Sequence, residues 1–295
     1  PWETPKPTTE DAESAHMLDA ILASESYIPA VRDLHFLGGS SSRGARLQLD
    51  YLKPESLLRK YGIEHTIVVF GSTRIVEPAA ALRKVEKLRA HLATQPGDSE
   101  LGARLAAAER ILAKSHFYET AREFSRLVAT SGRGPDDCRL VVMTGGGPGM
   151  MEAANRGARD VNARTVGLNI HLPHEQFPNP YISPELCFQF HYFALRKMHF
   201  MLRARALVAF PGGYGTFDEL FETLTLIQTR KIKPVPVILV GEAFWRKAFD
   251  VDFLVDEGVI DPEDRDLFWY AETAEEAWQG LLLWYERKGE PLIEE

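Results

Sequence analysis

The chain has 295 residues, which is long enough to bury a sizeable core in one large domain or two small ones. Its formal net charge of −8 argues against nucleic acid as the main partner, although local arginines and backbone N–H groups can still bind phosphates. The sequence has no run of eighteen or more apolar residues, so no membrane span is expected. The Pro/Thr-rich beginning does not resemble a signal peptide. Cys138 and Cys187 are expected to be buried in strands and reduced, which indicates a cytoplasmic protein.

The first half of the chain predicts mainly helices around one buried strand. Residues 1–60 are expected to form a helical and loop extension, with an amphipathic helix at 10–24 and a loop at 38–44. An apolar strand follows at 64–74 and ends in glycine and serine. The Ala-, Leu-, Arg- and Glu-rich stretch 77–130 predicts a helical insertion of two or three long helices, whose charged faces are expected to be solvated.

From residue 138 onward, predicted strands and helices alternate. The expected strands are 138–147, 164–170, 186–190, 206–213, 235–241 and 266–272. The expected helices are 149–161, 193–206, 216–231, 243–258 and a last one from Glu275. Buried strands separated by helices indicate an α/β fold: a single Rossmann-like parallel sheet with helices on both faces, spanning 61–295 with the insertion inside it.

Three of the predicted strands end in glycine-rich turns, at 71–74, 144–149 and 211–216. Ligands of an open parallel sheet bind beyond the carboxyl ends of its strands, where free N–H groups and helix N-termini attract anions. One such turn can be a simple tight connection, but three on the same edge predict a site for a nucleotide or sugar phosphate. The expected substrate-binding residues in these turns are Gly71, Ser72, Gly145, Gly146, Gly147, Gly212, Gly213, Gly215 and Thr216.

Other chemistries fit the sequence less well. A dinucleotide fingerprint needs a third glycine where Met150 stands, and the next strand ends in Asn169 instead of an acidic residue. A proline separates His171 from His174 and no third ligand is evident, so no metal is expected. The G-x-S-x-G motif of a serine hydrolase is absent, and no lysine is marked out for a pyridoxal Schiff base, so no cofactor is expected.

The carboxylates that follow the third turn allow two interpretations. Thr216 and Glu219 have the spacing of a capping box, in which each side chain bonds the other's backbone N–H. Alternatively, Glu219 faces the ribose of a bound nucleotide and stabilises the positive charge that develops as an N-glycosidic bond breaks, with Glu222 on the same helix face. In that case the helix N-terminus is expected to keep Glu219 ionised, as a base and not a general acid. Asp218 is turned away and is expected to be a first-turn acid.

Basic residues precede the turn 211–216 in the sequence. Arg196, His199 and Arg203 share one face of a predicted helix, an arrangement that is often a solvated basic stripe. Arg196 and Lys197, however, fall between two site-forming elements. Because a guanidinium does not deprotonate in practice, Arg196 is expected to clamp the phosphate or the leaving base. Lys197 is expected among the substrate-binding residues, together with Glu222.

At these positions the chain resembles the LOG family, named for cytokinin-activating "lonely guy" enzymes and often labelled lysine decarboxylases. Residues 211–219, PGGYGTFDE, match that family's P-G-G-x-G-T-x-x-E motif completely. Arg196 and Lys197 match the end of its M-H-x-R-K motif, whose Met and His are replaced by Phe193 and Ala194. The segment TGGGPGMMEAANRGA resembles the glycine-rich motif of bacterial members and of nucleotide nucleosidases, and the similarity covers about residues 64–260.

The resemblance implies hydrolysis of nucleoside 5′-monophosphates to free base and ribose 5-phosphate, without a cofactor, by homodimers. It also implies that Arg196 and Glu219 are catalytic. Because the motif histidine is missing, AMP-like nucleotides, as in an AMP nucleosidase, are better expected substrates than cytokinin nucleotides. A second possibility is a non-catalytic carrier of a nucleotide or of molybdenum cofactor, because related Rossmann-like carriers use similar glycine turns.

Overall fold

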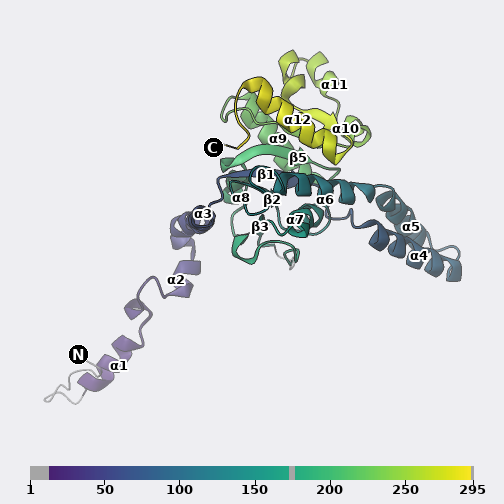
Figure 1. Ribbon diagram of the computed structural model, residues 1–295. Coiled ribbons are helices and arrows are strands. Elements are labelled where there is room, and N and C mark those ends of the chain that lie inside the picture. Colours follow the sequence, from purple (N-terminus) through teal and green to yellow (C-terminus); the bar gives the residue numbers. More distant parts are fainter. Residues whose placement is uncertain (1–12, 173–176, 294–295) are drawn as a thin grey trace. The chain divides into compact units, whose positions relative to one another are not determined.

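The computed structural model describes residues 13–172 and 177–293 (Figure 1). The described chain forms two compact units, one up to Leu52 and the other from Lys53 onward. The predicted division into 1–60 and 61–295 stays a prediction, as does the treatment of 77–130 as one insertion. No helix within the described ranges is both long and apolar enough to cross a membrane.

The first unit consists of short helices. They are α1 (Ser14–Leu22), the 3₁₀ turns Glu25–Tyr27 and Ser40–Ser42, α2 (Leu34–Gly38) and the beginning of α3 (Arg43–Lys60). The predicted helix at 10–24 is found as α1, with residues 10–12 outside the described part of the chain. The predicted loop at 38–44 is wrong. Asp33 caps α2 by accepting from the Phe36 N–H at 2.8 Å, and the Arg46 guanidinium donates to the Leu37 and Gly39 carbonyls, so the segment is held in helical turns.

One parallel sheet organises the second unit. Its strands are β1 (His65–Phe70), β2 (Leu140–Thr144), β3 (Thr165–Ile170), β4 (Cys187–Phe190), β5 (Ala204–Ala209), β6 (Val237–Val240) and β7 (Trp269–Ala271). They lie in the order β4-β3-β2-β1-β5-β6-β7, and every adjacent pair is parallel. All of the predicted strands are therefore confirmed. The chain builds outward from β1 to β4 and then crosses back to β5, so the topological switch point lies between β1 and β5.

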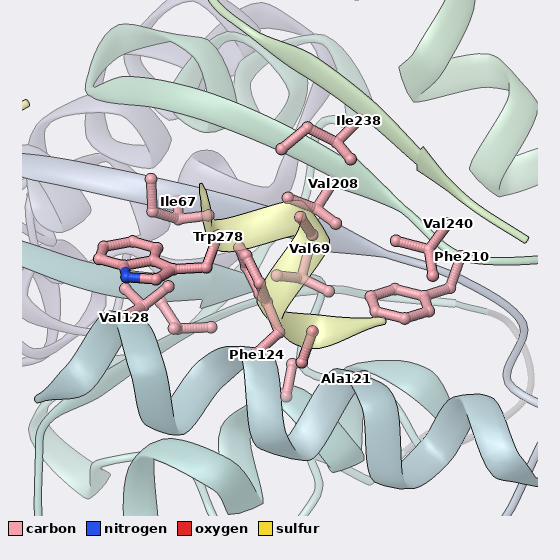
Figure 2. Packing of buried hydrophobic residues seen from close by; sticks show 14 of the residues in the cluster. Ile67, Val69, Ala121, Phe124, Val128, Val208, Phe210, Ile238, Val240 and Trp278 are labelled. Carbon is pink, nitrogen blue, oxygen red and sulfur yellow. The ribbon is translucent and has the colours of Figure 1, made fainter. Parts of the chain in front are cut away.

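Helices cover both faces of this sheet, as predicted. On one face lie α6 (His116–Ala129), α7 (Met150–Asp160) and α12 (Ala274–Lys288), whose apolar side chains share a core with β1, β2 and β5. Figure 2 shows this core, with Phe124 of α6 and Trp278 of α12 against the strand residues Ile67, Val69 and Val208. On the other face lie α8 (Phe193–Leu202), α9 (Tyr214–Gln228) and α10 (Glu242–Ala248), which pack through Phe200, Leu220 and Trp245.

Two helices pack mainly on each other. These are α4 (Pro78–Thr94) and α5 (Ser99–Leu112), which lie side by side in Figure 1 and enclose a small core of their own. Its buried members are Val85, Leu88, Leu101 and Ala108. The prediction of two or three long helices in this stretch is confirmed, because α4, α5 and α6 follow one another here.

Two further predictions are wrong. The expected helix 243–258 is divided into α10 and α11 (Val251–Asp256), because Phe249 is extended and Asp250 caps α11 by accepting from the Phe253 N–H at 3.1 Å. The cysteines are only half-buried, and Cys138 precedes β2 instead of lying within it; both are free thiols.

Candidate functional site

A cavity of about 1210 Å³ opens at the carboxyl ends of β1 and β5, beside the switch point of the sheet. Two of the predicted turns line it: 71–74 after β1 and 211–216 after β5. We call these two turns together the glycine rim. Arg196 and Glu219 line the same cavity, so the structure brings together most of the residues that the sequence singled out.

Direct hydrogen bonds join the two turns of the glycine rim. The Ser72 N–H donates to the Pro211 carbonyl at 3.0 Å, and the Phe210 N–H donates to the Phe70 carbonyl at 2.9 Å. The Ser72 hydroxyl oxygen accepts from the Arg74 N–H at 3.1 Å, which fixes the turn beyond β1. The rim is therefore a continuation of the sheet and not a pair of loose loops.

The third predicted turn, 144–149, lies outside the cavity lining and supports the rim from behind. Gly146 and Gly149 have φ of 73° and 74°, and a Cβ on Gly149 would collide with the backbone of Ser72 and Thr73. This close approach lets the Met150 N–H donate to the Ser72 carbonyl at 3.1 Å. Binding of substrate by Gly145, Gly146 and Gly147 stays a prediction; what the structure describes is their packing role.

A buried polar network, which the sequence analysis missed, holds this third turn. The Thr144 hydroxyl donates to the Asn155 side-chain oxygen at 2.7 Å and accepts from the Gly146 N–H at 3.0 Å. The Asn179 amide donates to the same Asn155 oxygen at 2.9 Å and to the Gly147 carbonyl at 3.0 Å. Buried polar groups are costly unless they are paired, so this network fixes one conformation of the turn. Nothing local in the sequence links Asn179 to it.

The capping-box interpretation of Thr216 and Glu219 is wrong. Helix α9 begins at Tyr214, its N-cap is Gly213, and no side chain caps it. Glu219 thus lies in the second turn of the helix, and Asp218 is likewise beyond the first turn. With helix capping removed as an explanation, the position of Glu219 on the cavity wall needs another one.

Glu219 is a nearly buried residue, with a relative exposure of 7%. Within the described part of the chain, no hydrogen bond or ion pair reaches its carboxylate oxygens. Burial raises the pKa of Glu219 to about 7, against the attraction of Lys197 and Arg196. The prediction that the helix N-terminus keeps this group fully ionised is therefore wrong: near neutral pH it exchanges a proton readily, as either an acid or a base requires.

The acids on either side of Glu219 are neutralised by one lysine. The Lys197 ammonium lies 2.8 Å from the Asp218 carboxylate and 2.9 Å from that of Glu222. Burial by itself lowers the pKa of Lys197, but its hydrogen bonds to Asp218 and Glu222 outweigh burial, and the net effect raises the pKa. Lys197 and Glu222 are outside the cavity lining, so direct binding of substrate by them stays a prediction.

Main-chain carbonyls hold Arg196 against the site. Its Nε donates to the Leu168 carbonyl at 2.7 Å and its Nη2 to the Gly145 carbonyl at 3.5 Å, while the guanidinium lies 5.1 Å from the centre of the Phe200 ring. Burial lowers the pKa of Arg196, and the nearby charges of Glu219 and Asp218 act in the opposite direction. The group remains a cation at any ordinary pH.

The other members of the predicted basic stripe have structural roles. His199 is buried, with its ring 5.2 Å from that of Phe190. Arg203 binds both carboxylate oxygens of Glu55, at 2.7 and 3.0 Å, and the Ile63 carbonyl. Arg196 alone of the three lines the cavity.

Helices α4 and α5 form the opposite side of the cavity, which the sequence analysis did not anticipate. Lys84, Arg104 and Arg110 line it, although their charged helix faces were expected to be merely solvated. In the described ranges, no group of three or more His, Cys, Asp or Glu side chains is arranged to hold a metal ion, and His174 lies outside those ranges.

Comparisons with known proteins show which proteins this chain is similar to. The family model described as "possible lysine decarboxylase" matches residues 151–281. The chain is 29% identical over 139 residues to the cytokinin riboside 5′-monophosphate phosphoribohydrolase LOG3 of Arabidopsis thaliana, covering 46% of this chain and 63% of that one. It is 31% identical over 137 residues to the probable cytokinin riboside 5′-monophosphate phosphoribohydrolase LOGL5 of Oryza sativa subsp. japonica. This match covers 45% of this chain and 54% of that one. The chain thus spans less than two thirds of the length of either relative.

Among solved structures, the structural-genomics target TM1055 is 23% identical, with a TM-score of 0.46 over 74% of this chain and 99% of that one. A Moco carrier protein from Chlamydomonas reinhardtii is 18% identical, with a TM-score of 0.43 over 76% and 99%. The family match over residues 151–281 includes the Arg196-Lys197 pair and the whole PGGYGTFDE motif. Over part of its sequence, this chain is therefore similar to the family described as possible lysine decarboxylases and to these LOG proteins.

Proposed function

We propose that the protein is a nucleoside 5′-monophosphate phosphoribohydrolase, which cleaves AMP-like nucleotides to free base and ribose 5-phosphate. Cytokinin nucleotides, which the names of its relatives mention, are the second candidate substrates. The observation that carries the proposal is Glu219: a nearly buried carboxylate on a cavity wall, with no partner among the described residues and a pKa raised to about 7. Such a group destabilises the folded state at neutral pH, so its position is best explained by chemistry.

The 5′-phosphate is assigned to the turn 211–216. Gly213 and Gly215 have open space around them, and the first N–H groups of α9 have no partner within the helix. The positive end of the α9 dipole points toward the same place. Thr216 is buried beside Gly212, where its hydroxyl adds a possible donor to the phosphate site. This binding holds the ribose so that C1′ is presented to Glu219.

The reaction replaces the bond between C1′ and the base nitrogen by a bond between C1′ and a water oxygen. As the C1′–N bond breaks, its electron pair leaves with the base and the ribose becomes oxocarbenium-like, which the ionised Glu219 stabilises. Glu219 accepts the proton that the water loses and returns it to the departing base. Arg196, held by two carbonyls, binds the phosphate or the leaving base and keeps positive charge beside the carboxylate.

The direct test is to incubate the purified protein with AMP and assay free adenine and ribose 5-phosphate. Release of both in equal amounts supports the proposal. The adjacent carboxylate offers a matched control: Asp218→Asn removes one of the two acids on Lys197 and should keep turnover within a few-fold. Tight AMP binding with no adenine released would instead support a nucleotide or molybdenum-cofactor carrier.

The remaining expectations belong to the same proposal: a homodimer in the cytoplasm that acts without a cofactor. Light scattering on the eluting protein measures the mass in solution. Dialysis against a metal chelator before the AMP assay should leave turnover unchanged.

A further inference from the structure

The cavity has far more positive charge than a nucleoside monophosphate can use. The cationic side chains that line it are Arg74, Lys84, Arg104, Arg110, Lys114 and Arg196, while Glu219 supplies the carboxylate. This concentration contrasts with the net charge of −8 for the whole chain. We call Lys84, Arg104, Arg110 and Lys114, which lie on α4, α5 and the turn directly after α5, the hairpin wall.

In the described part of the chain, no carboxylate of the protein pairs with the cations of the hairpin wall. Among the described residues, Lys84, Arg104 and Arg110 form no salt bridge, and Lys114 donates only to the Arg110 carbonyl, at 3.3 Å. Elsewhere on the same two helices, Arg89 pairs with Glu109 at 2.7 Å. Glu109 thus neutralises a cation outside the cavity, and the cations inside it are available to a ligand.

A nucleoside monophosphate leaves this charge unmatched. Its single phosphate carries about −2 at neutral pH, and the glycine rim, the α9 N-terminus and Arg196 already serve that group. The base at the other end of the molecule is neutral. The cavity volume of about 1210 Å³ also exceeds the roughly 300–1,000 Å³ of an ordinary small-molecule site.

We propose that the hairpin wall binds a second phosphate group, so that a nucleotide with two phosphates binds more tightly than a monophosphate such as AMP. The proposal rests on the assignment of the cavity as a nucleotide site. The second phosphate has two possible chemical sources: a 5′-diphosphate, or a 3′-phosphate on the ribose. In either case the glycine rim positions the bond to be broken, and the hairpin wall selects the ligand by charge.

The test measures dissociation constants by calorimetry at about 0.15 M salt, where attraction between well-separated exposed charges is largely screened. The ligands are AMP, ADP and adenosine 3′,5′-bisphosphate, in the Glu219→Gln background to prevent turnover. Lys84→Gln/Arg110→Gln removes two charges of the hairpin wall. Arg83→Gln/Lys87→Gln is the matched control, because these exposed residues lie on α4 but do not line the cavity. Glutamine keeps helix propensity in all four substitutions.

We expect either ADP or adenosine 3′,5′-bisphosphate to bind about tenfold more tightly than AMP, which corresponds to two or three exposed charge contacts. The cavity double variant should reduce that advantage to about twofold or less, and the control should preserve it. The better of the two ligands identifies where the second phosphate is attached. Equal affinity for all three ligands overturns the proposal, as does an advantage that survives in the cavity variant or falls equally in both variants.

These outcomes are independent of catalysis. If the wild-type protein fails to release adenine from AMP, ADP and the bisphosphate alike, the proposed hydrolysis fails while the affinity ratios still decide the role of the hairpin wall. If AMP is cleaved and the ratios are flat, only the second-phosphate site is lost.

Discussion

The two sides of the cavity are built in opposite ways. The glycine rim continues a buried sheet, is tied by backbone hydrogen bonds and rests on a polar network behind it. The hairpin wall projects exposed cations from two helices whose own core has only four buried members. Rigid geometry suits bond breaking, in which small displacements are costly, whereas exposed charges suit recognition of a phosphate. The contrast suggests that the rim determines the reaction and the hairpin determines the substrate.

The strongest way to break this division is Glu219→Gln. If the rim determines the reaction, this variant should lose at least about 10³-fold in kcat, because it removes the main group that stabilises the transition state. Nucleotide binding should remain nearly intact. Adenine release under single-turnover conditions and calorimetry with AMP measure the two quantities. A variant that retains its rate per folded molecule would contradict the catalytic assignment.

The same substitution should stabilise the protein. In the folded state the pKa of Glu219 is about 7, above its ordinary value of 4.5, so the folded state binds a proton more tightly than the unfolded state does. The stability that the raised pKa of Glu219 contributes is therefore fully present below about pH 4.5 and is lost as pH rises through 7. Above pH 7, Glu219→Gln should be more stable than wild type by up to about 3 kcal/mol, the free energy equivalent of that difference in pKa.

Urea unfolding of both proteins at several pH values between 4.5 and 8 measures this effect. The gap between the two should widen as pH increases. Asp218→Asn serves as the control, because its carboxylate is half exposed and pairs with Lys197. A Glu219→Gln protein that is less stable at pH 8 would indicate a structural role for the carboxylate.

Removing the 5′-phosphate tests the rim from the ligand side. Adenosine should be cleaved at least about 10²-fold more slowly than AMP at equal concentration, since binding energy from the phosphate holds C1′ against Glu219 and lowers the barrier itself. Ribose 5-phosphate should compete with AMP, because it keeps the anchored half. Comparable rates on adenosine and AMP would mean that the glycine turns are purely structural and would favour a nucleoside hydrolase.

The strands and the glycine rim could be predicted from the sequence better than the helices around them. The strands and the rim were predictable because each glycine turn directly follows a short Val-rich run, and the PGGYGTFDE motif is contiguous. Helix α3 was missed, since it is highly charged and carries Pro54 in its interior. The capping box failed because α9 begins at Tyr214, two residues before the expected start.

The properties of the site depend on contacts that the sequence does not display. The raised pKa of Glu219 results from its burial, which the residues around it in the sequence do not reveal. The cations of the hairpin wall were mistaken for a solvated face, because the sequence does not show which side of α4 and α5 lines a cavity.

The smallest expected effect concerns Arg196, which lies in α8 and lines the cavity together with the rim. Arg196→Lys keeps the charge but loses the planar fork that donates to the Leu168 and Gly145 carbonyls together, so kcat/KM for AMP should fall about tenfold, and Arg196→Ala should fall further. Binding should weaken along with turnover, because an anion clamp acts in both the ground state and the transition state. Arg203→Lys is the matched control at the end of the same helix: it disturbs the paired bonds to Glu55 and should lower stability while leaving the rate per folded molecule unchanged. Full activity of Arg196→Lys would show that positive charge alone suffices there. In that case the geometry of the rim would matter less at Arg196 than its charge, and the contrast with the hairpin wall would apply to Glu219 and the glycine turns but not to this arginine.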